Sequence, residues 1–501
     1  MNIAMLLHKR LPLRAAAMAT AGVLITACAA SPPAPALGLS ATFTGGGGEV
    51  VSPTADWWQV FNDPVLDHMI TRGLAGNHDA RLAITRVQMA RAGVTAGQSR
   101  LLPSLALTGS RSDSRSGLPP PYKNGEPDTR ATRIGAELSW ELDLFGAARA
   151  ARRAARHDLL AAEAGIEGVR LLVSGEIARQ YFTLRAARER LQLLDDILVT
   201  LRGTEALTRK REAAGLASLL DVELATGERL AAEALQPQLS TLVTATRARL
   251  AVLLGQNPGE PLAELDSAPP RAPWPDPGAP ATGQPADLLA RRPDLRAAEQ
   301  QLAAESERLR EARAQYLPKF FLSAVFGSQE LTLNSVALSP VRYSLVAAAF
   351  SAPLFTGGRI RAGVQAQGAR EQQALLHYER QILTAVEEVE VSLAAVNDER
   401  RRVSLLAGAV AARQQALGRG DSLYRAGQID LLQLQILQRA AMAADQALVE
   451  SEAQRALNTI RLHQALGGSW QSAPASAATP PLARPAPTSK TSSQSLMSTP
   501  S

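Results

Sequence analysis

Two pairs of segments in this chain alternate between apolar and other residues, which is the pattern of β-strands. We predict strands near residues 102–116, 130–145, 318–328 and 342–355, with loops at 113–130 and 329–340. Within 133–144, alternate side chains point to opposite faces: Ile134, Ala136, Leu138, Trp140, Leu142 and Leu144 to one, and Arg133, Gly135, Glu137, Ser139, Glu141 and Asp143 to the other. One face therefore meets water, and the other meets a protein core or lipid.

A long stretch with helical periodicity follows each strand pair. Residues 147–211 contain no Pro, and their apolar residues recur at spacings of three and four, as in Ile166, Val169, Val173, Ile177, Tyr181 and Leu184. About 65 residues at ~1.5 Å each give a helix of ~100 Å, and 360–424 repeats the pattern. Because a polar helix of this length needs coiled-coil partners, we predict antiparallel partners at 217–254 and 429–466, after turns at Gly215 and Gly427.

The chain also repeats itself. Five short motifs occur twice in the same order, at offsets of 210 to 215 residues. Leu101-Leu102-Pro103 corresponds to Tyr316-Leu317-Pro318, for example, and Leu144-Phe145-Gly146 corresponds to Leu354-Phe355-Thr356-Gly357. Such a repeat indicates a duplicated architecture. We therefore predict a first repeat at 49–257 and a second at 286–470, joined by a Pro-rich linker at 258–285.

Composition narrows the possible classes of protein. Of the 501 residues, 46% are hydrophobic, only 4% are aromatic and one is Cys. A single Cys excludes an intramolecular disulfide, an all-thiolate zinc site and an iron–sulfur cluster, and few aromatic residues argue against a stacking platform for nucleic-acid bases. The formal net charge of +6 falls to +3 without the three cations of residues 1–27, so we expect no nucleic-acid partner. A mean hydropathy of −0.06 is not that of a helical membrane transporter.

Both ends of the chain carry distinctive segments. Residues 1–27 combine a basic start, an apolar run and small residues, and are predicted to be a secretory signal peptide. Cys28 follows in a sequence that resembles a bacterial lipobox, so we expect a covalent lipid on Cys28 rather than a buried free thiol. The next residue, Ala29, is not the Asp that favours inner-membrane retention, which implies the outer membrane. Residues 28–48 are predicted to form a lipidated flexible tether, and 471–501 a disordered tail.

The strand number bears on oligomeric state. Strands of roughly 10–12 residues have the length that a barrel strand needs to cross a bilayer, but exposed sheet edges are not tolerated in lipid. Since the smallest single-chain barrels use about eight strands, four strands must be completed by other copies: two would give a filled barrel and three an opening. The predicted fold class is therefore a mixed α/β membrane protein, in which the long antiparallel coiled-coil helices extend the wall of a barrel as a tube across the periplasm.

Four motifs carry a resemblance to a known family. In chain order they are Trp57-Trp58-Gln59-Val60-Phe61-Asn62-Asp63-Pro64, Ala290-Arg291-Arg292-Pro293-Asp294-Leu295-Arg296-Ala297-Ala298-Glu299, Pro353-Leu354-Phe355-Thr356-Gly357-Gly358 and Tyr424-Arg425-Ala426-Gly427. The match covers about residues 50–470. On these motifs the chain resembles the TolC superfamily of outer-membrane factors, specifically the lipidated NodT/OprM-like branch of RND-type efflux systems.

The resemblance implies a homotrimer with a 12-stranded transmembrane β-barrel and a periplasmic α-barrel. It implies an outer-membrane channel of a Gram-negative bacterium, in contact with outer-membrane lipid and anchored by the lipid on Cys28. Such a channel is the passive exit duct of a tripartite efflux pump for drugs and toxic small molecules, and its partners are a periplasmic adaptor (membrane fusion) protein and an inner-membrane RND pump. The alternative is a TolC-like duct for type I protein secretion. A periplasmic coiled-coil scaffold would not explain two strand pairs in a duplicated chain.

The same resemblance implies a gate at the helix tips, closed by hydrogen bonds and ion pairs, often with a ring of Asp, and opened by an iris-like shift. The gate candidates are Tyr424, Arg425, Gly427, Asp430 and Arg439, with Gly215 at the first-repeat tip. Related channels commonly carry Asp nine residues after the tip Gly, where this chain has Ile436. Either Asp430 takes over the acidic role or the constriction is apolar. The alternative for each charge is a solvated coiled-coil face, and for Tyr424 it is ordinary packing.

No pattern for catalysis or cofactor binding stands beside these motifs. The sequence has no H-E-x-x-H, G-x-S-x-G, P-loop or dinucleotide-binding motif, and its isolated His residues are expected on surfaces or in helix packing. Glu387, Glu388 and Glu390 form an acidic cluster, for which we expect a solvated or tunnel-lining face rather than acid–base chemistry. We therefore predict that the protein is not an enzyme and has no metal or cofactor besides the covalent lipid on Cys28.

Overall fold

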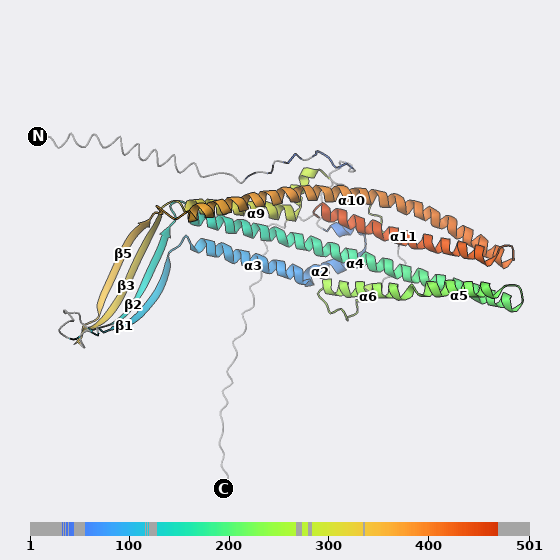
Figure 1. Cartoon of the computed structure of the whole chain (residues 1–501), viewed down its shortest axis with the longest axis horizontal. Helices are drawn as coiled ribbons and strands as arrows, with labels where there is room; N and C mark the ends of the chain where they lie inside the picture. The colour runs from blue at the N-terminus through green and yellow to red at the C-terminus, as the bar shows by residue number, and fades with distance from the viewer. Residues whose placement is uncertain are drawn as a thin grey trace, which may run out of the picture.

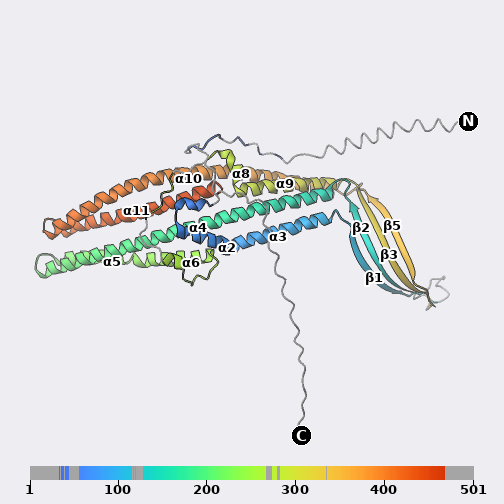
Figure 2. The same ribbon diagram turned by 180° about the vertical axis from the view of Figure 1, so that it is seen from behind.

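The computed structural model of the chain describes residues 33, 35, 37–38, 40–44, 56–115, 117, 119, 128–266, 273–278, 283–333 and 336–468. The predicted signal peptide, Cys28 and the predicted tail lie outside the described residues. The molecule is elongated and bent, with a curved β-sheet at one end and a layer of long helices that extends away from it (Figure 1). The view from behind shows the same bend between sheet and helices (Figure 2).

Both halves of the chain build the same series of elements. The first half runs α2 (Pro64–Gly76), α3 (His78–Ser99), β1 (Ser104–Ser114), β2 (Thr129–Leu142), α4 (Ala147–Ala213), α5 (Leu219–Glu233) and α6 (Gln236–Leu253). The second runs α8 (Leu288–Arg291), α9 (Pro293–Ala314), β3 (Lys319–Leu333), β4 (Val336–Ala337), β5 (Val341–Ser351), α10 (Arg359–Arg425) and α11 (Leu431–Ala465). Three short elements complete the described chain: η1 (Trp57–Phe61), α7 (Ala263–Asp266) and η3 (Pro285–Asp287).

The helices form one layer of four rows. The long helices α4 and α10 have 67 residues each. Helix α4 packs against α3, α5 and α6 on one side and against α9 and α11 on the other, and α10 packs against α9 and α11 (Figures 1 and 2). In α4 the predicted apolar series points inward as expected, because Val173, Ile177 and Leu184 are buried. Among the described residues, no helix is both long and apolar enough to cross a membrane.

Each half contains a point where two helices meet end to end, α6 with α3 and α11 with α9. In the first half, the Asn77 side chain accepts hydrogen bonds from the first amides of α3 and donates one to the Leu253 carbonyl at the end of α6 (2.9 Å). In the second half, Arg292 precedes α9 and donates to the Ala465 carbonyl of α11 (3.0 Å). One polar side chain therefore supplies the partner that an end carbonyl needs at each junction.

The return helix of the first half differs from its prediction as a single element over 217–254. It is divided into α5 and α6, with Ala234 and Leu235 between them. Pro237 lies in the first turn of α6, where its missing amide proton costs no hydrogen bond, whereas in the middle of a continuous helix it would break one. The corresponding helix of the second half, α11, has no Pro and is continuous over 35 residues.

The sheet has the strand order β1-β2-β3-β5, all antiparallel, and β4 pairs with the end of β3. The four predicted strands are present, but β3 continues to Leu333 through part of the predicted loop at 329–340. The physical reason is register: residues 329–333 of β3 pair with Arg133 through Thr129 of β2, so the backbone hydrogen bonds continue into a polar stretch. The pairing of β2 with β3 joins the two halves into one sheet.

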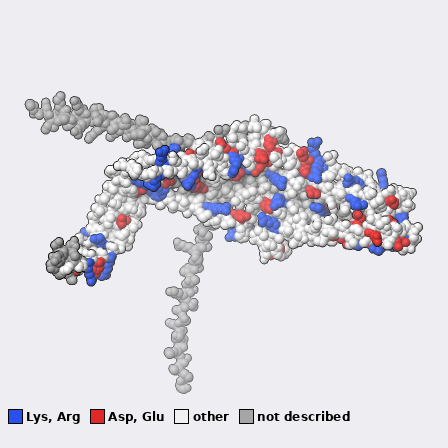
Figure 3. All heavy atoms as spheres, in the orientation of Figure 1, with Lys and Arg blue, Asp and Glu red and all other residues white. Residues whose placement is uncertain are grey.

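One face of the sheet is apolar over much of its length. Direct partners across the strands place Leu105 beside Leu138, Ala136 beside Phe326, and Phe320 beside Phe350. Large apolar side chains of this sheet are exposed: Leu105, Leu107, Ile134, Phe326, Val346 and Phe350. The described residues leave these side chains uncovered, which favours lipid over a soluble sandwich core as their environment. In the space-filling view the middle section of the sheet is mostly uncharged, with a single acidic patch, whereas charges gather towards its two ends (Figure 3).

Two segments pack onto the helical layer from outside it. Element η1 and helix α2 bury Trp57, Phe61 and Leu66 against α4, and the Trp57 indole donates a hydrogen bond to Ser174 of α4 (3.2 Å). The segment predicted as a flexible tether is docked near its end: Phe43 is buried beside α10, and the Thr44 amide donates to Glu390 (2.9 Å). Composition alone does not reveal this docking.

Candidate functional site

The candidate gate lies where the two helical hairpins end, at the tips farthest from the sheet (Figure 1). Both tips turn in the same way, through Gly215 at φ +71° and Gly427 at φ +73°. The amide of Gly215 donates to the Glu212 carbonyl and the next amide to Arg211, and Gly427 repeats this arrangement with Tyr424 and Leu423. This is the Schellman arrangement, in which a residue with positive φ closes a helix end. The two Gly predicted at the tips therefore terminate α4 and α10.

Tyr424 connects the two hairpins. Its side chain is only 3% exposed, although it belongs to α10, and its hydroxyl lies 3.3 Å from the Thr208 hydroxyl of α4. The Arg211 guanidinium lies 4.9 Å from the centre of the Tyr424 ring and donates to the Tyr424 carbonyl (3.3 Å). A cation over an aromatic face is attractive. Tyr424 therefore does more than fill space within its own hairpin, because it fixes the second tip against the first.

A second connection between the hairpins lies further from the tips. Arg439 of α11 forms an ion pair with Glu228 of α5 at 3.4 Å, and Gln438 donates to the Thr204 hydroxyl of α4 (3.0 Å). Arg425, by contrast, pairs with Asp421 one turn earlier in its own helix (2.9 Å). Of the two predicted gate arginines, the structure therefore brings only Arg439 to the other hairpin.

The acidic candidate Asp430 has a local role in the structure. It precedes α11, and its carboxylate accepts a hydrogen bond from the Gln433 amide (2.8 Å), which caps the helix. Ile436 is 54% exposed, and other large apolar side chains are exposed at the two tips: Leu216, Leu219 and Leu220 at the first and Leu432 at the second. A carboxylate that caps a helix and a cluster of exposed apolar residues favour the apolar alternative for the constriction.

Sequence reasoning missed a cluster of charges inside the first hairpin. Glu205 of α4 accepts hydrogen bonds from Arg209, Thr226 and Arg229, with the Arg229 contact at 2.6 Å. Hydrogen bonds from Arg209 and Arg229 lower the pKa of Glu205 to about 2. The i to i+4 spacing of Glu205 and Arg209 was a visible signal, but Arg229 comes from another helix, and its contact depends on the fold.

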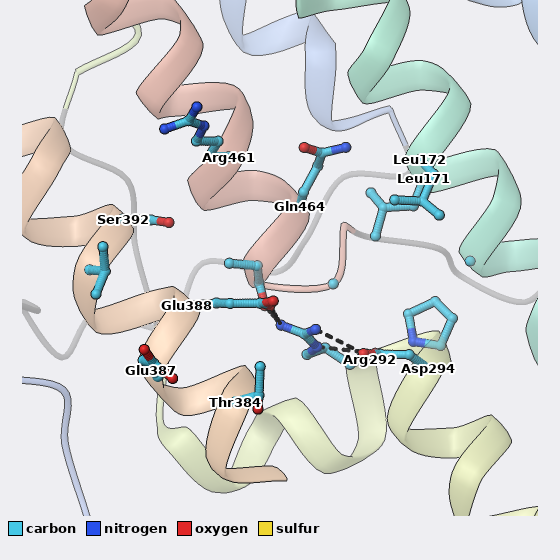
Figure 4. A pocket seen from close by; sticks show the side chains of 15 residues that line it. Leu171, Leu172, Arg292, Asp294, Thr384, Glu387, Glu388, Ser392, Arg461 and Gln464 are labelled. Carbon is cyan, nitrogen blue, oxygen red and sulfur yellow. Dashed lines mark hydrogen bonds and ion pairs between the residues drawn. The ribbon is translucent and has the colours of Figure 1, made fainter. Parts of the chain in front are cut away.

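The acidic cluster of α10 is divided among different contacts. Glu388 pairs with Arg292 at 2.6 Å, Glu390 holds Thr44, and Glu387 lines a recess beside Arg292 (Figure 4). We predicted a solvated or tunnel-lining face for this cluster. Glu387 and Glu388 line the recess, whereas Glu390 does not. Of the isolated His residues, His463 is buried and stacks on Trp57, and burial lowers its pKa to about 4. No group of His, Cys, Asp and Glu able to hold a metal ion occurs within the described residues.

An apolar-faced sheet continued by a layer of ~100 Å helices defines a class of outer-membrane channel with a helical extension. The profile of the outer membrane efflux protein family matches residues 69–256 and again residues 285–468. The chain is 31% identical to the pyoverdine export outer membrane protein OpmQ of Pseudomonas aeruginosa, over 90% of this chain and 96% of OpmQ. This chain belongs to the outer membrane efflux protein family.

Solved structures agree with this assignment. The outer-membrane channel OprN superposes with a TM-score of 0.80 at 28% identity, over 88% of this chain and 98% of OprN. The outer membrane protein VceC of Vibrio cholerae superposes with a TM-score of 0.75 at 26% identity, over 84% of this chain and all of VceC. The protein is thus an efflux channel of the outer membrane of a Gram-negative bacterium, with a TolC-like fold whose long helices extend into the periplasm. The family is one of channels rather than of known enzymes.

Proposed function

We propose that three copies of this chain form a passive exit duct for drugs and other toxic small molecules. In this proposal a periplasmic adaptor protein and an inner-membrane RND transporter supply the cargo and the energy. The observation that carries the proposal is the pair of open edges on the sheet: among the described residues, β1 pairs only with β2, and β5 pairs only with β3. Unpaired backbone groups are not tolerated in lipid.

The number of copies follows from strand count. Joining β5 of one copy to β1 of the next closes the sheet, and three copies of the four long strands give a 12-stranded barrel, wider than the filled barrels of about eight strands. The helical layer supports the same closure. Its outer row α10 exposes Leu376 and Leu383, which lie seven residues apart, the spacing of a coiled-coil seam. Leu405, 22 residues further and one residue beyond three heptads, is exposed as well. On the opposite row, α3 exposes Leu82 and Met89, again seven residues apart.

The docked N-terminal segment supports a lipid anchor on Cys28. The 16 residue steps from Cys28 to Thr44 span at most ~55 Å. Thr44 binds Glu390, which lies 31 residues beyond the start of α10, or ~47 Å at the helical rise. The number of residues between Cys28 and Thr44 is therefore enough to span the distance to the membrane end of the helices. Labelling with a radioactive fatty acid tests this anchor: we expect incorporation in the wild type and none in Cys28→Ser, and incorporation in Cys28→Ser would contradict it.

We further propose that the tip contacts close the duct at rest. Tyr424 and Arg439 hold the two hairpins of one copy together, and Ile436 and the exposed apolar residues of the tips meet their counterparts from the other copies. Opening then requires the second hairpin to separate from the first, while Gly427 and Asp430 keep the shape of its tip. Small-molecule cargo agrees with the name of OpmQ, which describes export of pyoverdine.

The central test is the oligomeric state of the membrane-extracted protein, together with its ability to restore efflux. A heat-labile trimer band is expected on gels of unheated outer-membrane extracts. Expression with a matching adaptor and RND pump is expected to restore drug resistance to a strain that lacks its own outer-membrane channel. A monomer released with the soluble periplasmic fraction would overturn the proposal. Restored secretion of a protein substrate without restored drug resistance would instead support type I secretion.

A further inference from the structure

A recess of about 660 Å³ opens in the helical layer where α11 ends and α9 begins (Figure 4). Four helices surround it, because the middle row is interrupted here while its neighbours α4 and α10 continue. Its walls combine apolar and charged side chains from these helices: Leu171 and Leu172 of α4, Arg292 and Asp294 at α9, Glu387 and Glu388 of α10, and Arg461 of α11. This volume lies in the range of sites for drug-sized molecules, roughly 300–1,000 Å³.

The recess opens on the face of the layer opposite to η1 and the docked N-terminal segment. On α11, His463 stacks on Trp57 of η1, and Arg461 lines the recess. On α4, Ser174 holds the same Trp57, and Leu172 lines the recess. Two residues are ~200° around a helix, so the two members of each pair point to opposite faces.

Helix α10 also has the recess and the docked N-terminal segment on opposite faces. Glu390 holds Thr44 of the N-terminal segment, and Glu388, two residues earlier, lines the recess. The additional elements therefore pack on one face of the wall, and the recess lies on the other. In the tube of the proposed function, segments that pack as a second layer lie outside the tube, since inside it they would block the duct. The recess accordingly faces the lumen.

The charges of the recess favour a cation. Arg292 is buried and fully engaged, with Asp294 at 2.8 Å, Glu388 at 2.6 Å and the Ala465 carbonyl at 3.0 Å. The Asp294 and Glu388 side chains remain nearly half exposed, and Glu387 is exposed with no partner among the described residues. Three carboxylates thus line the recess against two guanidinium groups, those of Arg292 and Arg461, which leaves one negative charge in excess. Leu171, Leu172 and Val391 add apolar surface to its lining.

We propose that this recess is a transit site for cationic amphipathic molecules, meaning molecules with an apolar body and a single positive charge. The inference rests on the proposed function, because it needs the lumen of a closed tube. The apolar residues take up the body of the molecule and the carboxylates attract its charge. Because the carboxylates are partly solvated, the attraction is weak, which suits a site that cargo must also leave.

The test compares two ions of nearly the same shape and opposite charge, tetraphenylphosphonium and tetraphenylborate. Their binding to the purified trimer in zwitterionic nanodiscs is measured by titration calorimetry, with empty nanodiscs subtracted. We expect tetraphenylphosphonium to bind more tightly than tetraphenylborate. Glu387→Gln should weaken its binding roughly two- to fivefold, the effect of one exposed charge pair, and Arg461→Gln should strengthen it by a similar factor. Val391→Arg, at an exposed position, should weaken it further by placing another positive charge in the recess.

Asp398→Asn is the matched control. Asp398 is an exposed carboxylate on α10, 11 residues and so about three turns beyond Glu387, and it does not line the recess, so its loss should leave binding unchanged. Equal binding of the two ions, or binding that is unchanged in both Glu387→Gln and Val391→Arg, would overturn the transit site. Conductance of the same preparation separates the two proposals: a conducting trimer without selective binding contradicts only the transit site, and a non-conducting monomer contradicts the duct.

Discussion

The two helical hairpins of this channel have the same design but are held together differently. Each has a 67-residue helix, a Gly turn with positive φ and an antiparallel return. The first hairpin is cross-linked internally by Glu205, which binds Arg229 of α5 at 2.6 Å, and by Glu233, which binds Arg202 of α4 at 3.0 Å. The comparable part of the second hairpin uses weaker polar contacts, such as Gln414 with Asp445 (3.0 Å).

The second hairpin instead supplies side chains that reach outside itself. Tyr424 inserts against α4, and Arg439 pairs with α5. Its junction also uses the charged Arg292, which reaches α10, where the first half uses the amide of Asn77. The proposed gate thus divides the work between the two repeats: the first hairpin is braced internally, and the second makes the contacts that opening would break. The following predictions test this division.

The largest expected effect concerns the glycines that the two ends of one hairpin require. Gly255, at the junction, has φ +73°, and a Cβ there would lie 2.4 Å from the Gly76 carbonyl oxygen. Gly215, at the tip, has φ +71° with open space around it. Gly215→Ala should cost about 1–2 kcal/mol for the backbone conformation, and Gly255→Ala should add about 1–3 kcal/mol for overpacking.

The measurement is the dissociation temperature of the detergent-solubilised oligomer. Samples are incubated at increasing temperatures, and the loss of the oligomer band is followed on gels. The second half provides matched controls. Gly467→Ala should lower the dissociation temperature less than Gly255→Ala does, because its Cβ would lie 3.0 Å from Arg292. Gly427→Ala should lower it by about as much as Gly215→Ala does. Equal melting of Gly255→Ala and Gly215→Ala would show that junction and tip tolerate a side chain equally, contrary to the close approach described here.

The next effect is a pH dependence confined to the first hairpin. The pKa of Glu205 is about 2, below the ordinary value of 4.5. A lowered pKa in the folded state means that the ion pairs stabilise the hairpin fully above about pH 4.5 and are lost as the pH falls towards 2. Pepsin, which is active in acid, should therefore cut α5 increasingly relative to α11 over this range. In Glu205→Gln the ratio of cleavage in α5 to cleavage in α11 should be high already at pH 4.5. If the variant keeps the pH profile of the wild type, Glu205 is excluded as the cause.

The smallest expected effect on stability concerns the contact between hairpins. Arg439 and Glu228 are 50% and 28% exposed, so their ion pair is worth less than about 1 kcal/mol. Arg439→Ala should nevertheless raise single-channel conductance in planar bilayers, because it removes a contact that holds the tips closed. Arg425→Ala is the comparison, since its pair with Asp421 lies within one helix, and it should change conductance less. Unchanged conductance in Arg439→Ala would remove Arg439 from the closing contacts.

Much of the fold could be predicted from sequence because it is locally encoded. The apolar pattern located all four long strands, β3 as far as residue 328, and the absence of Pro over 147–211 predicted a single long α4. The errors arose where local chemistry is ambiguous. The polar end of β3 resembles a loop, and only its pairing with β2 makes it a strand. The division of α5 from α6 was signalled by Pro237, whose position in a first turn could have been inferred.

The candidate site was less predictable, since its contacts join residues far apart in the chain. The sequence places Tyr424 at a tip but does not reveal that it packs against Thr208, 216 residues away. Asp430 could have been identified as a helix cap, because Asp directly before an apolar helix start favours that role. The recess exists only because two helices end at the same point between two that continue, which no local pattern specifies.

The equal length of α4 and α10 has a consequence for how such a channel can vary. Both helices have 67 residues and end at tips side by side (Figures 1 and 2). An insertion in one row would displace its tip by ~1.5 Å per residue and separate Tyr424 from its partners. Each of the four rows of helices therefore has to match the same wall length, and a longer or shorter wall requires matched changes in all four rows. We expect natural variation in this family to leave the rows untouched and to accumulate instead in the tether, the linker and the loops at the far end of the sheet.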